Sequence, residues 1–268
     1  MASTGNAASS MAGIGAAAGL NVTIFLPAAA PEAKMVQSLQ YGATVHRVDG
    51  TYDDAFDLSM EFAAQASGIN RNTGFNPLTI EGKKTAALEI FRQLGTAPDV
   101  VYVPTGDGVI LSGVYKGFRD LQSLGFIGDI PRIVAVQSEG SCAITRAFRE
   151  KRFGVPVPSR TIADSISVDV PRNGFHALRN LERYAGQCIT VQDTSILEAQ
   201  HRLSASAGIF TEPAAATAFA GLLADRANLK GSEIIVVLAT GHGLKDVATA
   251  RRGIHVPENT VRTLEDLT

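Results

Sequence analysis

The feature that most constrains the fold is an alternation of two kinds of segment along the chain. Short runs rich in β-branched and other apolar residues are separated by longer stretches in which apolar residues follow helical spacing. Strands that are apolar at nearly every position are typical of parallel sheets covered on both faces. Strands that alternate with helices therefore predict an α/β protein with mostly parallel sheets.

The segment boundaries follow from these patterns. The expected strands are 22–26, 44–48, 100–103, 133–136 and 234–238. The expected helices are 9–18, 32–41, 52–66, 79–94, 112–124, 141–150, 177–185, 194–207 and 213–227. In helix 32–41, Met35, Val36 and Leu39 follow helical spacing, so we expect them on the buried face and Lys34 outside.

Composition excludes several classes of function. With 268 residues and 45% apolar content, the chain can bury a sizeable core in one large domain or two smaller ones. A net charge of −2 gives no basic surface for nucleic acid or membrane. Cys142 and Cys188 lack the spacing of a metal pair or disulfide framework, and we expect free thiols in a cytoplasmic protein.

A glycine-bearing loop follows the expected strand 100–103. It reads Pro104-Thr105-Gly106-Asp107-Gly108 and leads into a helix. Glycines let consecutive N–H groups face one point, and the helix end adds positive potential, so phosphate is the expected guest. A tight turn with no ligand explains the loop about as well. A dinucleotide-binding fingerprint needs glycine at position 111, where the chain has Leu111, and an ATP-binding phosphate loop needs a Gly-Lys-Ser/Thr sequence, which does not follow. The loop therefore predicts a phosphate but neither NAD nor ATP.

Two further loops carry polar groups at the ends of buried segments. Thr240 follows the strand 234–238, and its hydroxyl is placed to face a ligand. His242, between two glycines, is expected to be a solvent-facing turn residue. The opening stretch Ser3-Thr4-Gly5-Asn6 presents hydroxyls, free amides and a carboxamide at a helix start, which suits a carboxylate and one further polar atom.

Taken together, the loops resemble the tryptophan-synthase-β-like enzymes, the fold-type II enzymes that depend on pyridoxal 5′-phosphate, and among them most closely the threonine synthases. STGNAAS is similar to that family's asparagine loop, NPLTIEGKKTAALEI to its NP-x-x-x-EG-x-KT stretch, and VPTGDGVILSG to its cofactor-phosphate loop. AVQSEGSCAI, ADSISVDVPRNG, GIFTEPAAATA and LATGHGLKD occur in the family's order.

The resemblance implies a role for each site residue. Ser3, Thr4, Gly5 and Asn6 would bind the substrate carboxylate, and Asn6 would also bond the cofactor's ring hydroxyl. Thr105, Gly106, Asp107, Gly108 and Val109 would cradle the cofactor phosphate, while Thr240 would face the pyridine nitrogen. A neutral hydroxyl there makes the ring a milder electron sink, suited to elimination and replacement at the side chain.

The implied reaction converts O-phospho-L-homoserine and water into L-threonine and phosphate, and we expect a homodimer. Two residues depart from the family's pattern. Thr79 stands where some relatives carry an arginine for the substrate's phosphate, and a hydroxyl is a weaker partner than a guanidinium. Asp107 would bring a negative charge near the cofactor phosphate unless its side chain turns outward.

The family's Schiff-base lysine lies in a Ser-x-Lys-Asp/Asn-Arg motif that precedes the asparagine loop, and no such motif occurs among the 268 residues. We therefore expect a truncated chain with no catalytic residue of its own and little turnover. Residues 1–71 would be the remainder of a small α/β domain, and residues 72–268 a large one. Lys83 and Lys84 are expected on a helix surface, and Lys245 in a structural role.

Two other functions stay open from the sequence. A threonine or serine dehydratase shares the asparagine and phosphate loops, although we would expect Ser or Cys where this chain has Thr240. A non-catalytic module that binds pyridoxal phosphate or another metabolite is the second alternative. Keto-acid formation from threonine would identify the dehydratase, and cofactor binding without any product would identify the module.

Overall fold

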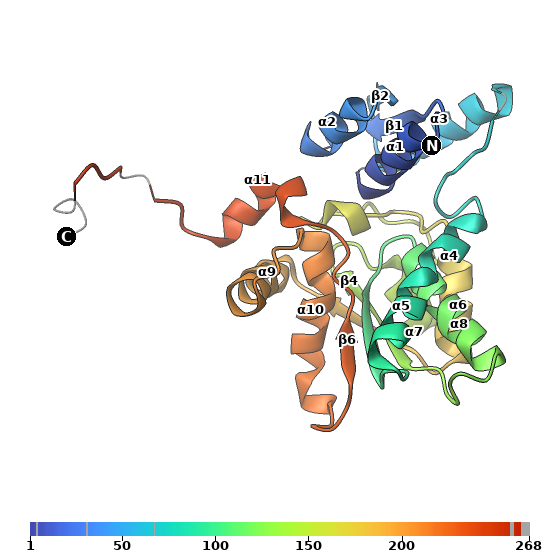
Figure 1. Cartoon of the computed structure of the whole chain (residues 1–268), viewed down its shortest axis with the longest axis vertical. Coiled ribbons are helices and arrows are strands. Elements are labelled where there is room, and N and C mark those ends of the chain that lie inside the picture. Colours follow the sequence, from blue (N-terminus) through green and yellow to red (C-terminus); the bar gives the residue numbers. More distant parts are fainter. Residues whose placement is uncertain (4, 31, 67, 258–259, 264–268) are drawn as a thin grey trace.

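The computed structural model describes residues 1–3, 5–30, 32–66, 68–257 and 260–263. Two separate sheets organise the chain: a two-stranded sheet of order β1-β2 and a four-stranded sheet of order β5-β4-β3-β6. Both are parallel throughout, which confirms the α/β expectation. Figure 1 shows the two sheets in two lobes, which we call the N-terminal lobe (residues 1–65) and the C-terminal lobe (residues 78–250).

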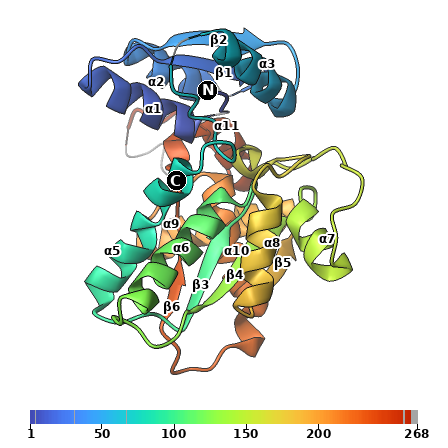
Figure 2. The ribbon, with the colours of Figure 1, turned by 90° about the vertical axis from the view of Figure 1, so that its right-hand side faces the viewer.

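In the part of the chain that the structure describes, the N-terminal lobe consists of the two-stranded sheet and three helices that pack around it. Its elements are α1 (Asn6–Ala17), β1 (Thr23–Pro27), α2 (Glu32–Gln40), β2 (Thr44–Val48) and α3 (Tyr52–Gln65). The first residues lie beside β1, because Ser3 N donates to Phe25 O at 3.1 Å and Phe25 N donates to Met1 O at 2.8 Å. This pairing holds the start of α1 at the edge of the sheet that faces the other lobe (Figure 2).

The C-terminal lobe is a larger sheet between two helical layers. Its strands are β3 (Val100–Pro104), β4 (Arg132–Ser138), β5 (Gln187–Val191) and β6 (Ile235–Val237). Its α-helices are α4 (Leu78–Lys83), α5 (Thr85–Leu94), α6 (Val109–Ser123), α7 (Ala143–Glu150), α8 (Gly174–Arg183), α9 (Asp193–Ala207), α10 (Pro213–Asp225) and α11 (Val247–Ala250). Short 3-10 turns include Asp164–Ile166 and Gly243–Lys245.

Alternate residues of the central strands enter two different cores. Val101 and Val103 of β3 pack with α6 and α8, whereas Val100 and Tyr102 pack on the opposite face with the alanines of α10. Successive side chains of a strand point to opposite faces, so a strand apolar at every position needs cover on both. The apolar runs of the sequence therefore correspond to the two covered faces.

The expected elements match the structure closely, with two exceptions. β5 was not predicted, and the expected helix 79–94 is two helices, α4 and α5, that meet at Lys84. All the predicted strands are present within two residues of their expected ends. No helix in the described ranges is long and apolar enough to cross a bilayer.

The orientation of α2 differs from the expectation. Lys34 is almost completely buried, at 1% exposure, while Val36 and Leu39 are each 48% exposed. Met35 is partly buried against the apolar cluster of the N-terminal lobe, as expected. The helical spacing was misleading for Val36 and Leu39, because the side of the helix that carries Lys34 meets polar groups of the C-terminal lobe. Lys34 faces the C-terminal lobe, where carboxylates receive its ammonium group.

Candidate active site

The phosphate loop joins β3 to α6 at the carboxyl edge of the large sheet. Gly108 is the residue that precedes the helix and has φ of 83°, a conformation that favours glycine. In the described part of the chain, none of the N–H groups of Gly106 to Leu111 makes a hydrogen bond. These donors, together with the positive end of a 15-residue helix, form an anion-binding position.

Side chains from outside the loop fix its shape. Asn173 Nδ2 donates to Gly108 O at 3.1 Å and to Ser112 Oγ at 2.6 Å. Gln137 Nε2 of β4 donates to Thr105 O at 3.2 Å. With its carbonyl groups engaged in this way, the loop can turn its N–H groups toward a ligand.

Asp107 of this loop is held by two donors. Tyr52 Oη of α3 donates to Asp107 Oδ2 at 3.3 Å, and the backbone N–H of Arg172 donates to Oδ1 at 3.0 Å. Burial raises the pKa of Asp107 to about 6, and the neighbouring carboxylate of Asp53 also raises it. The carboxyl group is thus part of a contact between the two lobes, and its charge is reduced in mildly acidic solution.

The asparagine loop is held in place from both lobes. Asn6 Nδ2 donates to Glu212 Oε1 at 2.6 Å, and Asn6 Oδ1 accepts from Lys245 Nζ at 2.7 Å. Since an amide nitrogen carries two hydrogens, one remains for a ligand. Ser3 Oγ accepts from the N–H groups of Gly5 at 3.1 Å and Ala8 at 3.2 Å, which leaves its own O–H to donate. Thr4 lies outside the described residues.

Lys34 is the centre of a buried charge network that joins the lobes. Its Nζ donates to both oxygens of Asp164, at 2.9 and 2.7 Å, and to Ser165 Oγ at 3.0 Å, and lies 3.6 Å from Glu212 Oε2. Its alkyl chain packs against Gly5, where a Cβ would lie 2.2 Å from Lys34 Cδ. Burial raises the pKa of Glu212, an effect that the ammonium of Lys34 opposes.

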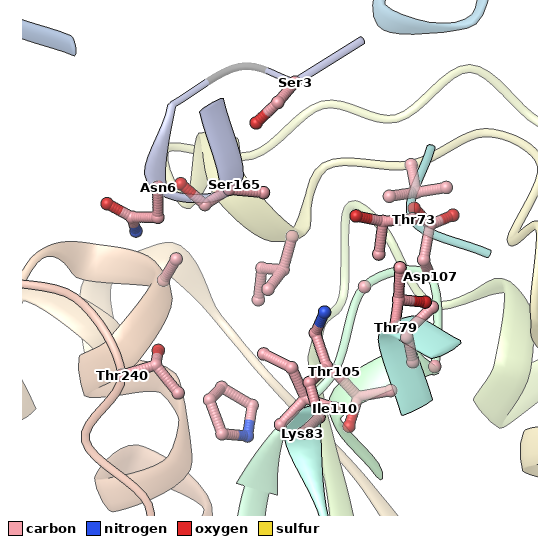
Figure 3. Close-up of a pocket in the computed structure, with 18 of the residues that line it drawn as sticks. Ser3, Asn6, Thr73, Thr79, Lys83, Thr105, Asp107, Ile110, Ser165 and Thr240 are labelled. Atoms are coloured by element: carbon pink, nitrogen blue, oxygen red, sulfur yellow. The ribbon is translucent and has the colours of Figure 1, made fainter. Parts of the chain in front are cut away.

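The three loops line one cavity of about 670 Å³ between the lobes. Nine of the predicted site residues are in its wall: Ser3, Asn6, Thr79, Thr105, Gly106, Asp107, Gly108, Val109 and Thr240. Gly5 is outside the lining and instead packs on Lys34. Figure 3 shows Asn6, Thr240, Thr105 and Lys83 around the open centre. The Thr240 hydroxyl makes no hydrogen bond to any residue that the structure describes, so it is free for a ligand.

The sequence interpretation placed Lys83 wrongly. Lys83 lines the cavity, whereas Lys84 lies outside it and pairs with Glu81 at 2.7 Å and Asp120 at 3.0 Å, as expected for a helix surface. Arg71, Lys34 and Glu212 also belong to the site or its supports. A Gly-rich loop gives a local signal, but these side chains gave none, because their partners lie far away along the chain. His242 is an exposed turn residue that accepts from Leu244 N at 3.1 Å, as predicted.

The donor set of this cavity fits pyridoxal phosphate. Unpaired N–H groups at the start of α6 suit the phosphate, the remaining Asn6 hydrogen suits a ring hydroxyl, and the free hydroxyl of Thr240 suits a ring nitrogen. Among the described residues, no cluster of three or more His, Cys, Asp or Glu side chains is placed to hold a metal ion. The polar groups of the lining, at the carboxyl ends of parallel strands, fit an organic, phosphate-bearing cofactor.

Comparison with known sequences agrees with this class. Residues 1–241 match the family described as "Pyridoxal-phosphate dependent enzyme", and the chain belongs to that family. Among its curated relatives are the threonine synthases of Methanocaldococcus jannaschii, 36% identical over 96% of this chain, and Mycobacterium bovis, 34% identical over 99%. The chain spans 64% of the length of the first and 74% of the second.

Solved structures give the same fold. A tomato threonine deaminase isoform has a TM-score of 0.77 at 24% identity and is matched over 94% of this chain and 71% of its own. Maize serine racemase has a TM-score of 0.78 at 21% identity, over 94% of this chain and 75% of its own. The architecture is thus that of the fold-type II enzymes, as the resemblance implied, and at these identities the likeness concerns the fold alone.

The conformation of Gly108 supplies the first prediction. In a Gly108→Ala variant, the new Cβ would lie 2.7 Å from Ala177 Cβ and 3.0 Å from Ile144 Cδ1, in addition to the positive φ. We expect the free energy of unfolding to fall by about 2–4 kcal/mol, from backbone strain and overpacking together. We also expect weaker binding of pyridoxal phosphate, because the start of α6 must shift. Denaturant unfolding and cofactor absorbance measure the two effects.

Gly19→Ala is the matched control. Gly19 also has a positive φ, of 66°, but nothing lies within 4 Å of its Cβ position. We expect this variant to lose about 1 kcal/mol and to bind the cofactor normally. Equal losses of stability in the two variants, with cofactor binding intact in both, would show that the close packing behind the phosphate loop is unimportant.

Proposed function

We infer that this chain supplies the cofactor-binding and substrate-binding residues of a threonine synthase, the enzyme that makes L-threonine and phosphate from O-phospho-L-homoserine and water. The observation that carries the proposal is the convergence of the three predicted loops on a single cavity. Threonine synthase relatives that match nearly the whole chain support it. Bound pyridoxal phosphate would supply the electron sink for elimination and replacement chemistry at the substrate side chain.

In this proposal each loop has one task. The N–H groups of Gly106 to Val109 hold the cofactor phosphate, and Thr240 offers a neutral hydroxyl to the ring nitrogen. Ser3 and Asn6 bind the substrate carboxylate, and the bonds of Asn6 to Glu212 and Lys245 fix the direction of its amide. Positioning of this kind lowers the activation free energy, because the reacting groups lose translational and rotational entropy on binding, before the chemical step.

The seven lysines of the chain are Lys34, Lys83, Lys84, Lys116, Lys151, Lys230 and Lys245, and none is in a Ser-x-Lys-Asp/Asn-Arg stretch. Lys34 and Lys245 are engaged in the hydrogen bonds described above, and Lys83, which lines the cavity, also lies outside that motif. We therefore propose that the 268-residue chain binds the cofactor non-covalently and has little turnover alone. Loss of a covalent anchor and proton carrier costs several powers of ten in rate.

The test begins with the purified chain and pyridoxal phosphate. We expect saturable cofactor binding, with no lysine adduct in the intact mass after borohydride reduction. A reduced adduct, together with threonine formation by the chain alone, would contradict this proposal. Fusing a segment that carries the Ser-x-Lys-Asp/Asn-Arg motif ahead of the asparagine loop should then give phosphate release from O-phospho-L-homoserine. Keto-acid formation from threonine instead would identify the dehydratase class.

We also propose a homodimer, from the resemblance to the family, and a cytoplasmic location, from the two free cysteines. Sedimentation equilibrium of the purified chain measures the first. Fractionation of the source cells measures the second.

A further inference from the structure

Two cations face the cavity without forming an ion pair to any residue that the structure describes. Lys83 reaches into it from the last residue of α4 (Figure 3), and Arg71 lines it from the loop before α4. Among the described residues, Lys83 Nζ has no hydrogen bond and no ion pair, and Arg71 bonds only to Thr73 Oγ1, at 3.1 Å. Half-buried cations are normally paired, so this arrangement suits the binding of an anion.

The electrostatics of the wall point the same way. Burial and, to a smaller extent, the positive charge of Arg71 together lower the pKa of Lys83 to about 8, against the opposing effect of the Asp107 carboxylate. Burial also lowers the pKa of Arg71. Asp107 is already engaged with Tyr52 and the Arg172 N–H, so it cannot neutralise both cations. A dianion placed between them would remove the repulsion and restore the protonated form of Lys83.

Thr79 does not supply a hydroxyl donor to this region. Its Oγ1 donates to Asn76 O at 2.7 Å, within the first turn of α4. Lys83 stands four residues later, which places it one turn further along the same face of the helix. The position is also rigid, because a Cβ on Gly113 of α6 would lie 2.5 Å from Lys83 Cβ. The positive charge that Thr79 lacks is thus present one turn away.

We propose that Arg71 and Lys83 form a second phosphate subsite of the cavity, separate from the N–H groups at the start of α6, and that it binds the phosphate monoester of the substrate. The inference rests on the proposed function for the identity of that substrate. Lys83 then takes the specificity role that the resemblance assigned to position 79. A phosphorylated substrate is favoured over an unphosphorylated hydroxy amino acid because only the former neutralises both cations.

The experiment is a calorimetric titration of the full chain with inorganic phosphate at pH 8.5, in the presence of saturating pyridoxal phosphate, which fills the α6 position. We expect one phosphate to bind and Lys83→Met to weaken it at least tenfold, with cofactor affinity unchanged. Because the pKa of Lys83 is below this pH, binding should take up roughly half a proton or more, measured in two buffers of different ionisation enthalpy. Lys83→Arg should keep the affinity within about threefold and lose the proton uptake.

Lys84→Met is the matched control, since Lys84 is adjacent but paired with Glu81 and Asp120, and we expect its phosphate affinity to be that of the unaltered chain. The proposal would be overturned if Lys83→Met lowered the affinity for pyridoxal phosphate but not for inorganic phosphate, because Lys83 would then bind the cofactor. Unchanged phosphate affinity in Lys83→Met, or no binding to the unaltered chain, would also overturn it. If pyridoxal phosphate does not bind to the chain, the proposed function is wrong. The subsite is then tested separately, by comparing the binding of inorganic phosphate to the cofactor-free chain with its binding to cofactor-free Lys83→Met.

Discussion

Replacing Lys34 by methionine is expected to lower the free energy of unfolding by about 3–5 kcal/mol, because the change leaves buried carboxylates without their cation. Lys34 is 1% exposed, as is its partner Glu212, and Asp164 is 29% exposed. The methionine side chain preserves most of the packing against Gly5, so the decrease in the free energy of unfolding arises mainly from removal of the positive charge. Urea unfolding at pH 7, followed by circular dichroism, measures it.

A second substitution separates charge from packing. Adding Glu212→Gln to the Lys34→Met variant removes the most deeply buried unpaired carboxylate, and we expect this to recover part of the lost stability. The pKa of Glu212, already raised by burial, should rise further in the single variant, so its stability should fall more steeply with increasing pH. A loss below about 1 kcal/mol in Lys34→Met would show that the network contributes no more than a surface ion pair.

Asp107→Asn is expected to stabilise the protein at neutral pH. The pKa of Asp107 in the folded chain is raised from 3.8 to about 6, so the folded state binds its proton more tightly than the unfolded state. The contribution of Asp107 to stability therefore falls as pH rises between about 4 and 6, by up to about 3 kcal/mol at 1.4 kcal/mol per pKa unit. Asparagine carries no charge, so the variant should lack this decline.

Unfolding of both proteins from pH 3.5 to pH 8 measures the difference, which should be near zero at the acid end. Asp120→Asn is the control with the opposite sign. Desolvation alone would raise the pKa of Asp120, but hydrogen bonds from Lys116 and Lys84 lower it overall. Asp120→Asn should therefore lose stability relative to the unaltered chain as pH rises. Parallel pH profiles for Asp107→Asn and the unaltered chain would contradict the assignment of Asp107 as a buried acid with a raised pKa.

The architecture was predictable because its signals are local. β-branched runs such as 133–136 and the alternating helices specify parallel sheets covered on both faces. β5 was missed because it contains Gln187 and Thr190 and is only partly buried at most positions, so its pattern does not resemble a central strand. The break at Lys84 was missed because the residues on both sides of it keep helical spacing.

The loops of the site were predictable for a similar reason, since a glycine-bearing turn after an apolar strand is visible in the sequence. The positions of Lys34 and Lys83 were not. Lys34 meets Asp164, which is 130 residues away, and its burial depends on how the lobes dock. Lys83 lies within the expected helix 79–94, but which side of α4 faces the cavity is set by packing against Gly113 of α6. Both errors arise from assuming that lysine side chains face solvent.

The way the lobes meet has a thermodynamic consequence. Each of the four apolar clusters found in the described chain lies wholly within one lobe. Hydrogen bonds and ion pairs connect the lobes instead, including Asn6 with Glu212, Lys34 with Asp164, and Arg172 with Asp53. Separating the lobes would hydrate polar groups and little hydrocarbon, so opening should show a small heat-capacity change and a marked sensitivity to dissolved salt.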